Sequence, residues 1–265
     1  MALALNHNKL QQLIGAPFPG RSPHELCRRE TVFLIGGNLP VYETLETMYE
    51  SYCLESTDLF HITFAGRDDL ERNLELVHQV KKNFPVRLMG RIAWEITAPI
   101  AEQAYLAGLD ILDLPWAPGG SGAAGHDDRQ AVLGHAAGIF PRWSTVSSLD
   151  PGSATAEQMR AAIDSLLAAG VVPLPTVTTG TEVLDRDAAG VTYEYLLAAW
   201  QRHEVLIKPL LPLIRLVTPL DSAEPAGFLR SVINRIQDRH HLATSDLRRH
   251  LRTSGAEASF ESAGL

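Results

Sequence analysis

The feature that most constrains the fold of this chain is a recurring unit, in which a short apolar run is followed by a polar or glycine-rich break and then by a helical pattern. The apolar runs occupy residues 32–35, 59–64, 86–92, 110–114, 143–147 and 171–177. The helical patterns that follow most of them occupy residues 41–53, 70–83, 98–107, 156–169 and 192–201. Thr155 and Gln158 form a capping-box pattern, and Gly108 and Gly170 are placed to end two helices. Because successive runs begin roughly 25–30 residues apart, the spacing predicts parallel βα units with right-handed crossovers.

Six or seven such units predict an α/β fold, as a (βα) barrel or a partial TIM-like barrel with parallel strands and following helices. A doubly wound sheet is the alternative, because strand order cannot be read from one sequence. No linker rich in Pro and Ser divides the chain, so residues 1–265 are expected to form a single domain with a helical extension at about 221–252 and a mobile tail. Residues 205–217 are apolar but contain Pro209 and Pro212, which favours an irregular or edge segment.

Composition excludes several classes of function. The chain has 265 residues, of which 45% are hydrophobic and 20% are charged, and its formal net charge is −8. This balance argues against disorder and against non-specific nucleic-acid binding. Pro or charged residues interrupt the apolar runs before they could span a membrane, and the N-terminus lacks the basic start of a secretory signal. We therefore expect a cytoplasmic protein whose partner is a small molecule, with no role for nucleic acid or a membrane.

Polar residues near the expected C-terminal ends of the strands are the candidates for a functional site, because βα barrels carry their chemistry at that edge. The expected substrate-binding residues are Arg91, Trp94, Trp116, Ser121, His126, Arg142, Ser144 and Thr176. Asp113 falls at the same edge. Each of these residues alone could be an ordinary loop or cap residue, and only their convergence on one rim indicates a site.

Arg91, Trp94 and Glu95 form the most compact group of these candidates, directly after a predicted strand. The planar guanidinium of Arg91 could grip a carboxylate or phosphate with two hydrogen bonds, and Trp94 offers a flat apolar face. Glu95 is a candidate catalytic residue, as a general base whose pKa would rise on partial burial. The structural alternative is an ion pair between Arg91 and Glu95, with Trp94 filling the mouth of the barrel.

Lys208 is the second candidate catalytic residue, because it stands in the apolar segment 205–214. A desolvated lysine has a lowered pKa and can form a Schiff base, whereas a lysine at the rim of such a segment would only extend its ammonium to water. No metal site is expected. The compact trio His126-Asp127-Asp128 is better explained as a helix start with acidic residues near its N-terminus.

Two stretches resemble radical S-adenosylmethionine proteins of the biotin-synthase-like branch. Residues 31–40, Thr-Val-Phe-Leu-Ile-Gly-Gly-Asn-Leu-Pro, are similar to the second-strand segment of that family, where a Gly-Gly-Glu-Pro-like turn contacts the methionine amino group of the cofactor. Residues 147–151 and 169–175 resemble its later βα units, so the resemblance covers about residues 31–177. It implies S-adenosylmethionine as a candidate cofactor, with contacts carried over to Gly36, Gly37, Asn38 and Pro40.

The resemblance departs from the family at its metal cluster. That family binds an iron–sulfur cluster through Cys-x-x-x-Cys-x-x-Cys, whereas this chain has only Cys27 and Cys53. The resemblance therefore implies a radical-SAM-like barrel without its own iron–sulfur cluster, which binds a small molecule or assists cofactor biosynthesis. A partner chain that supplies a cluster stays open. The alternatives are a cofactor-independent lyase or isomerase, which would use Lys208 or a carboxylate base, and a non-catalytic barrel scaffold.

The C-terminal region is the one basic patch of an acidic protein. It contains Arg235, Arg239, His240, His241, Arg248, Arg249, His250 and Arg252. One interpretation is a solvated helix face whose cations favour helix C-termini. The other is a docking surface for an acidic partner subunit or for a second copy of the chain.

Overall fold

The computed structural model of the protein describes residues 3–14, 22–116, 123–176, 186–222, 246–247 and 249–251. Its main element is a seven-stranded sheet whose order follows the chain, from β2 to β8. The strands are β2 (Leu26–Arg29), β3 (Val32–Gly36), β4 (Leu59–Thr63), β5 (Arg87–Arg91), β6 (Ile111–Asp113), β7 (Thr145–Leu149) and β8 (Val172–Pro175). Neighbours from β3 to β8 are parallel, and β2 is antiparallel to β3. The chain is therefore an α/β protein, and β2 and β8 are the two edges of the sheet.

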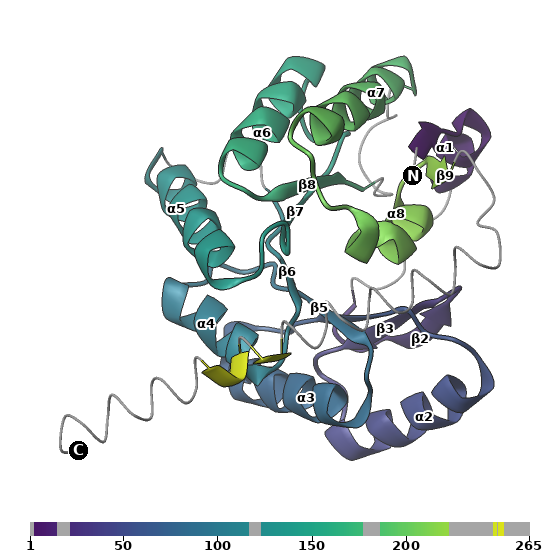
Figure 1. The fold of residues 1–265 in the computed structure, drawn as a ribbon, viewed down its shortest axis with the longest axis vertical. Helices are drawn as coiled ribbons and strands as arrows, with labels where there is room; N and C mark the ends of the chain where they lie inside the picture. The colour runs from purple at the N-terminus through teal and green to yellow at the C-terminus, as the bar shows by residue number, and fades with distance from the viewer. Residues whose placement is uncertain are drawn as a thin grey trace.

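Helices alternate with the parallel strands. They are α2 (Val41–Leu54), α3 (Leu70–Asn83), α4 (Ala98–Ala107), α5 (Ala123–Ile139), α6 (Ala156–Ala168) and α7 (Arg186–Arg202), with a single 3₁₀ turn, η1 (Arg67–Asp69), before α3. Figure 1 shows the sheet as a curve, with these helices following one another along its outer side. The predicted alternation of strands and helices is confirmed.

The inner side of the curve is covered by a short helix, α8 (Leu211–Val217), which follows the 3₁₀ turn η2 (Lys208–Leu210). The prediction of an irregular or edge segment here was wrong. Pro209 and Pro212 stand in the first turns of η2 and α8. A proline in a first turn costs no hydrogen bond, because the first N–H groups of a helix have no partner within the helix.

Three further small elements belong to the described fold. β1 (Leu3–Leu5) pairs antiparallel with β9 (Leu220–Ser222), and α1 (His7–Ile14) follows β1. Helical residues also occur at 246–247 and 249–251, within the helical piece expected near the C-terminus. The helix expected at 228–240 lies outside the described residues. Within the described parts of the chain, no helix is both long and apolar enough to cross a membrane.

The two faces of the sheet pack against different parts of the protein. Phe60 of β4 packs against Phe84, which follows α3, with 5.2 Å between the ring centroids, and Tyr52 of α2 packs on Phe84 at 5.4 Å. Phe60 therefore faces the outer helices. Because successive side chains of a strand point to opposite faces, its neighbour His61 faces the inner side, where α8 lies.

Candidate functional site

Polar side chains from the parallel strands meet at a small cavity on the inner side of the sheet. The cavity is lined by His61, Arg91, Asp113, Ser148, Leu174, Thr176, Leu213 and Val217. The strands contribute the polar residues near their C-terminal ends, and α8 contributes Leu213 and Val217. The space between these side chains has a volume of about 10 Å³, which is the room that one water molecule needs.

Arg91 and Asp113 form the charged centre of this cavity. They are paired neighbours at the ends of β5 and β6, and Arg91 Nη1 lies 2.7 Å from Asp113 Oδ2. The second oxygen of Asp113 accepts a hydrogen bond from the N–H of Ser148 at 2.9 Å, and Arg91 Nη1 also donates to Ser148 Oγ. The two side chains are 13% and 3% exposed. Asp113 and Ser148 therefore hold the guanidinium in one orientation.

The remaining donors of Arg91 are the part of this centre that a ligand could use. Within the described part of the chain, its Nε and Nη2 groups donate no hydrogen bond. An arginine fork can bind a carboxylate or phosphate through two parallel hydrogen bonds.

His61 is the second unusual group in the cavity. Its side chain is 2% exposed, and its Nδ1 atom is buried with no hydrogen-bond partner among the described residues. Burial lowers the pKa of His61 from 6.5 to about 4, while the nearby Asp113 and Arg91 act on it in opposite directions. The imidazole is therefore neutral at pH 7, and it belongs to a side chain that lines the cavity. A buried polar atom without a partner is costly and calls for a ligand or a water.

Of the residues expected from sequence, Arg91, Asp113 and Thr176 line this cavity. The ion pair of Arg91 is with Asp113, so the alternative pair with Glu95 is not formed. Glu95 is exposed. Trp94 packs against the hydrophobic core, where its Nε1 atom is buried without a partner among the described residues.

The other expected site residues are not brought to the cavity. Trp116 is partly buried against the core, and its backbone N–H donates to the backbone carbonyl of Ser148 at 2.8 Å. Arg142 and Ser144 precede β7, so they lie at the opposite, N-terminal edge of the sheet. Lys208 is half-buried at the start of η2 and does not line the cavity. Ser121 and the side chain of His126 lie outside the described residues.

The glycine-rich turn after β3 is closed by the protein itself. All three N–H groups of the turn donate to backbone carbonyls of this chain. The pairs are Gly36 to Glu25 at 2.6 Å, Gly37 to Thr63 at 2.8 Å and Asn38 to Pro23 at 2.8 Å. Pro40 is exposed at the start of α2.

Packing within the protein explains why this turn contains glycine. A Cβ atom on Gly37 would lie 1.8 Å from Asn73 Oδ1, and one on Gly36 would lie 2.3 Å from the backbone of Pro23. The space beside both residues is therefore filled by the chain. These residues do not fit the cofactor contact that the resemblance implies, and we derive no reaction step through S-adenosylmethionine.

Sequence reasoning missed His61 and Ser148. Both lie inside apolar strands, whereas the search for candidates covered the residues that follow the strands. His61 stands between Phe60 and Ile62 in a run that is otherwise apolar apart from Thr63. A polar side chain at an inward position of a buried strand is the signal that could have found it.

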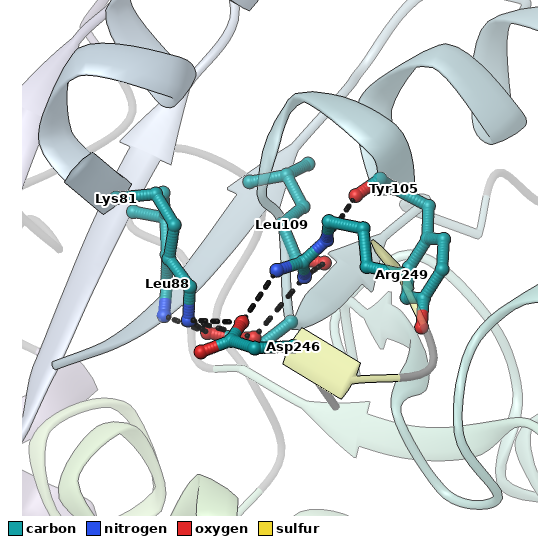
Figure 2. Close-up of polar contacts among 7 residues, drawn as sticks. Lys81, Leu88, Tyr105, Leu109, Asp246 and Arg249 are labelled. Carbon is teal, nitrogen blue, oxygen red and sulfur yellow. Dashed lines mark hydrogen bonds and ion pairs between the residues drawn. The ribbon is translucent and has the colours of Figure 1, made fainter. Parts of the chain in front are cut away.

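A second polar cluster lies near the N-terminal ends of β5 and β6, where Asp110 directly precedes β6 (Figure 2). Arg249 of the C-terminal segment is 9% exposed, and its Nε donates to the carbonyl of Tyr105 at 2.7 Å. Its Nη2 donates to the carbonyl of Leu109 at 3.0 Å and to Asp110 Oδ1 at 3.3 Å. Lys81 Nζ lies 2.9 Å from the other oxygen of Asp110. Arg249, a member of the expected basic docking patch, is thus used to anchor the segment to its own chain.

Comparisons with known proteins leave the function open. No family model and no curated protein matches this chain. One solved structure, described as a cube-shaped, highly porous protein cage designed by fusing symmetric oligomeric domains, is similar over 86% of this chain at 13% identity and a TM-score of 0.33. The chain spans 64% of the length of that structure. A likeness this weak bears on neither fold nor function. Among the described residues, no group of three or more His, Cys, Asp or Glu side chains could hold a metal ion.

Proposed function

We propose that this protein binds a small molecule through a carboxylate or phosphate group, in the cavity at the C-terminal ends of the parallel strands. The observation that carries the proposal is the position of Arg91. Asp113 and Ser148 hold its guanidinium through Nη1, which leaves the edge formed by Nε and Nη2 for an anion. A donor edge that is fixed before the ligand arrives loses little entropy on binding.

The arrangement of the sheet supports the same proposal. Strands in sequential order with helices on the outer side are the arrangement of a partial TIM-like barrel, which is how we interpret this fold. In such folds, ligands bind at the C-terminal ends of the strands, where Arg91, Asp113 and Thr176 lie. The cavity has room for about one water molecule, so a carboxylate or phosphate group enters only if the buried side chains of Leu213 and Val217 move aside.

A radical-SAM-like role, including assistance to cofactor biosynthesis, stays a prediction from the sequence resemblance. The lyase or isomerase alternative also stays a prediction. The cavity does not support it, because its expected catalytic residues, Glu95 and Lys208, do not line the cavity. Binding at Arg91 is compatible with either reading and can be tested without choosing between them.

The test is a thermal-shift screen of carboxylic acids, sugar phosphates, nucleosides and keto acids. A ligand present at a hundredfold excess over its Kd stabilises the folded state by about 2.7 kcal/mol, a rise in Tm of about 5–10 °C. Arg91→Lys keeps a charge beside Asp113 but loses the fork, so it should lose this rise. Arg67→Ala, at an exposed position, is the control and should keep it. A screen in which no compound gives a rise that depends on Arg91 refutes the proposal.

A further inference from the structure

We infer that an anion entering this cavity brings a proton with it, which is held on His61 in the complex. The inference rests on the proposed binding of an anion at Arg91 and adds to it the identity of the group that compensates its charge. It makes His61 a specificity-determining residue for an oxyanion over a neutral ligand of the same size.

The first step of the argument is the unused atom of His61. Nδ1 is buried and unpartnered among the described residues, on a side chain that is 2% exposed and lines the cavity. A neutral imidazole uses one nitrogen as donor and the other as acceptor, whereas the protonated form donates from both. An unprotonated carboxylate or phosphate oxygen can only accept. An anion that contacts a ring nitrogen of His61 therefore selects a ring that carries a hydrogen there, and the doubly protonated ring pairs with it best.

The second step is the charge of the cavity. The charged groups that face His61 are Arg91 from β5 and Asp113 from β6, and they form an ion pair with no net charge. The hydroxyl groups of Ser148 and Thr176 add no charge, and α8 contributes only Leu213 and Val217. An incoming anion would leave a net negative charge in this low-dielectric space, which is unfavourable without a compensating cation. His61 is the group on the lining that can supply one.

The third step is the direction of the linkage. In the free protein the pKa of His61 is about 4, lowered mainly by burial. An opposite charge in contact favours the charged form and shifts a pKa by about 1–3 units, so the pKa of His61 in the complex should lie near 5–7. Between these two values the complex binds more protons than the free protein. Ligand affinity must therefore rise as the pH falls, by at most about tenfold per pH unit.

The experiment is isothermal titration calorimetry of the full chain with two probes, formate as the smallest carboxylate and sulfate as an oxyanion that stands for a phosphate ester. Titrations in buffers of different ionisation enthalpy count the protons taken up. At about pH 5 we expect about half to one proton for each anion bound, falling toward zero at about pH 8. Tighter binding of formate would assign a carboxylate ligand, and tighter binding of sulfate would assign a phosphate ester.

Two variants connect the proton to its residue. His61→Asn keeps a polar group near the position of Nδ1 but cannot titrate, so it should bind without proton uptake and without pH dependence. His78→Asn, at an exposed position of α3, should behave as the wild type. If His61→Asn does not fold, the imidazole nitrogen shifts of His61 in the wild-type protein should move to those of the charged form when formate is added.

The outcomes separate this inference from the proposed function. Anion binding that depends on Arg91 but takes up no proton overturns the inference and leaves the proposed function standing. Proton uptake that survives in His61→Asn also overturns it, because another group would then carry the charge. If neither probe binds, the inference is wrong, while the proposed function is still decided by the wider thermal-shift screen.

Discussion

Replacing Arg249 by alanine should destabilise the protein strongly for a residue so close to the end of the chain. The C-terminal segment has little apolar surface to hold it, because Leu247 and Leu251 are 58% and 62% exposed. Asp246 Oδ1 of this segment lies 3.3 Å from Lys81 Nζ, and the main other contact with the body of the protein is made by the guanidinium of Arg249. That group binds two carbonyls and Asp110 and lies 5.0 Å from the centre of the Tyr105 ring.

The size of this loss in the free energy of unfolding follows from the hydrogen bonds that each partner of Arg249 loses. Asp110 keeps Lys81 at 2.9 Å and the N–H of Leu88 at 3.0 Å, so Arg249→Ala does not leave a buried charge alone. The carbonyls of Tyr105 and Leu109 lose charge-assisted hydrogen bonds, and such bonds are worth about 1.5–3 kcal/mol each. Since water can reach the vacated position, we expect a total loss of about 2–4 kcal/mol in the free energy of unfolding. For a chain of this size that is a fall in Tm of about 5–12 °C.

Urea denaturation and thermal unfolding measure this loss, and limited proteolysis tests whether the segment has been released. Arg67→Ala removes the same charge from an exposed position and should change stability by less than about 0.5 kcal/mol. Arg249→Lys should fall between the two, because an ammonium cannot bind both carbonyls and Asp110 with the same geometry. If Arg249→Ala is no less stable than Arg67→Ala, the anchor does not contribute to folding and the reasoning fails.

Three further predictions concern the body of the protein. Gly37→Ala should lower the free energy of unfolding by about 1–3 kcal/mol, because its Cβ would overlap Asn73 Oδ1; an unchanged urea midpoint would contradict this. The pKa of His61 is lowered to about 4, so the unfolded chain binds more protons than the folded one between about pH 4 and pH 6.5. The free energy of unfolding should therefore fall by up to about 3 kcal/mol as the pH is lowered from about 6.5 to 4. Denaturation curves of His61→Asn should show a smaller dependence on pH over that range. Thr155→Ala should cost about 1 kcal/mol by removing the capping box with Gln158, measured by thermal unfolding against the conservative Thr155→Ser.

Local patterns in the sequence were sufficient for most of the elements of the fold. The apolar runs became β3 to β8 within a few residues of their expected bounds, because a buried strand needs apolar side chains on both faces. Thr155 and Gln158 cap α6 reciprocally, as their spacing predicts. Gly108 and Gly170, expected at helix ends, have positive φ values of 132° and 74° there.

Tertiary context decided the elements that these patterns missed. The prolines of residues 205–217 were interpreted as breakers, whereas Pro209 and Pro212 start short helices. Strand β2 went unrecognised, because its pattern is only four residues long and its backbone is satisfied by antiparallel pairing with β3. Such pairing depends on which segment lies alongside, and this is not encoded within the segment itself.

The sequence alone determined that this is an α/β chain of repeated strand–helix units, because hydrophobic periodicity acts over a few residues. It also placed Arg91, Asp113 and Thr176 at the C-terminal edge of the sheet, because strand direction follows from the order of the units. Only the tertiary structure decided that Arg91 pairs with Asp113 instead of Glu95, that His61 opens onto the same cavity, and that Arg249 anchors the C-terminal segment. These contacts join residues that are 22 to 144 positions apart, or lie on different strands, and they arise from how the strands stack side by side. The free energy of each contact depends on burial and on its partners, which exist only once the chain has folded.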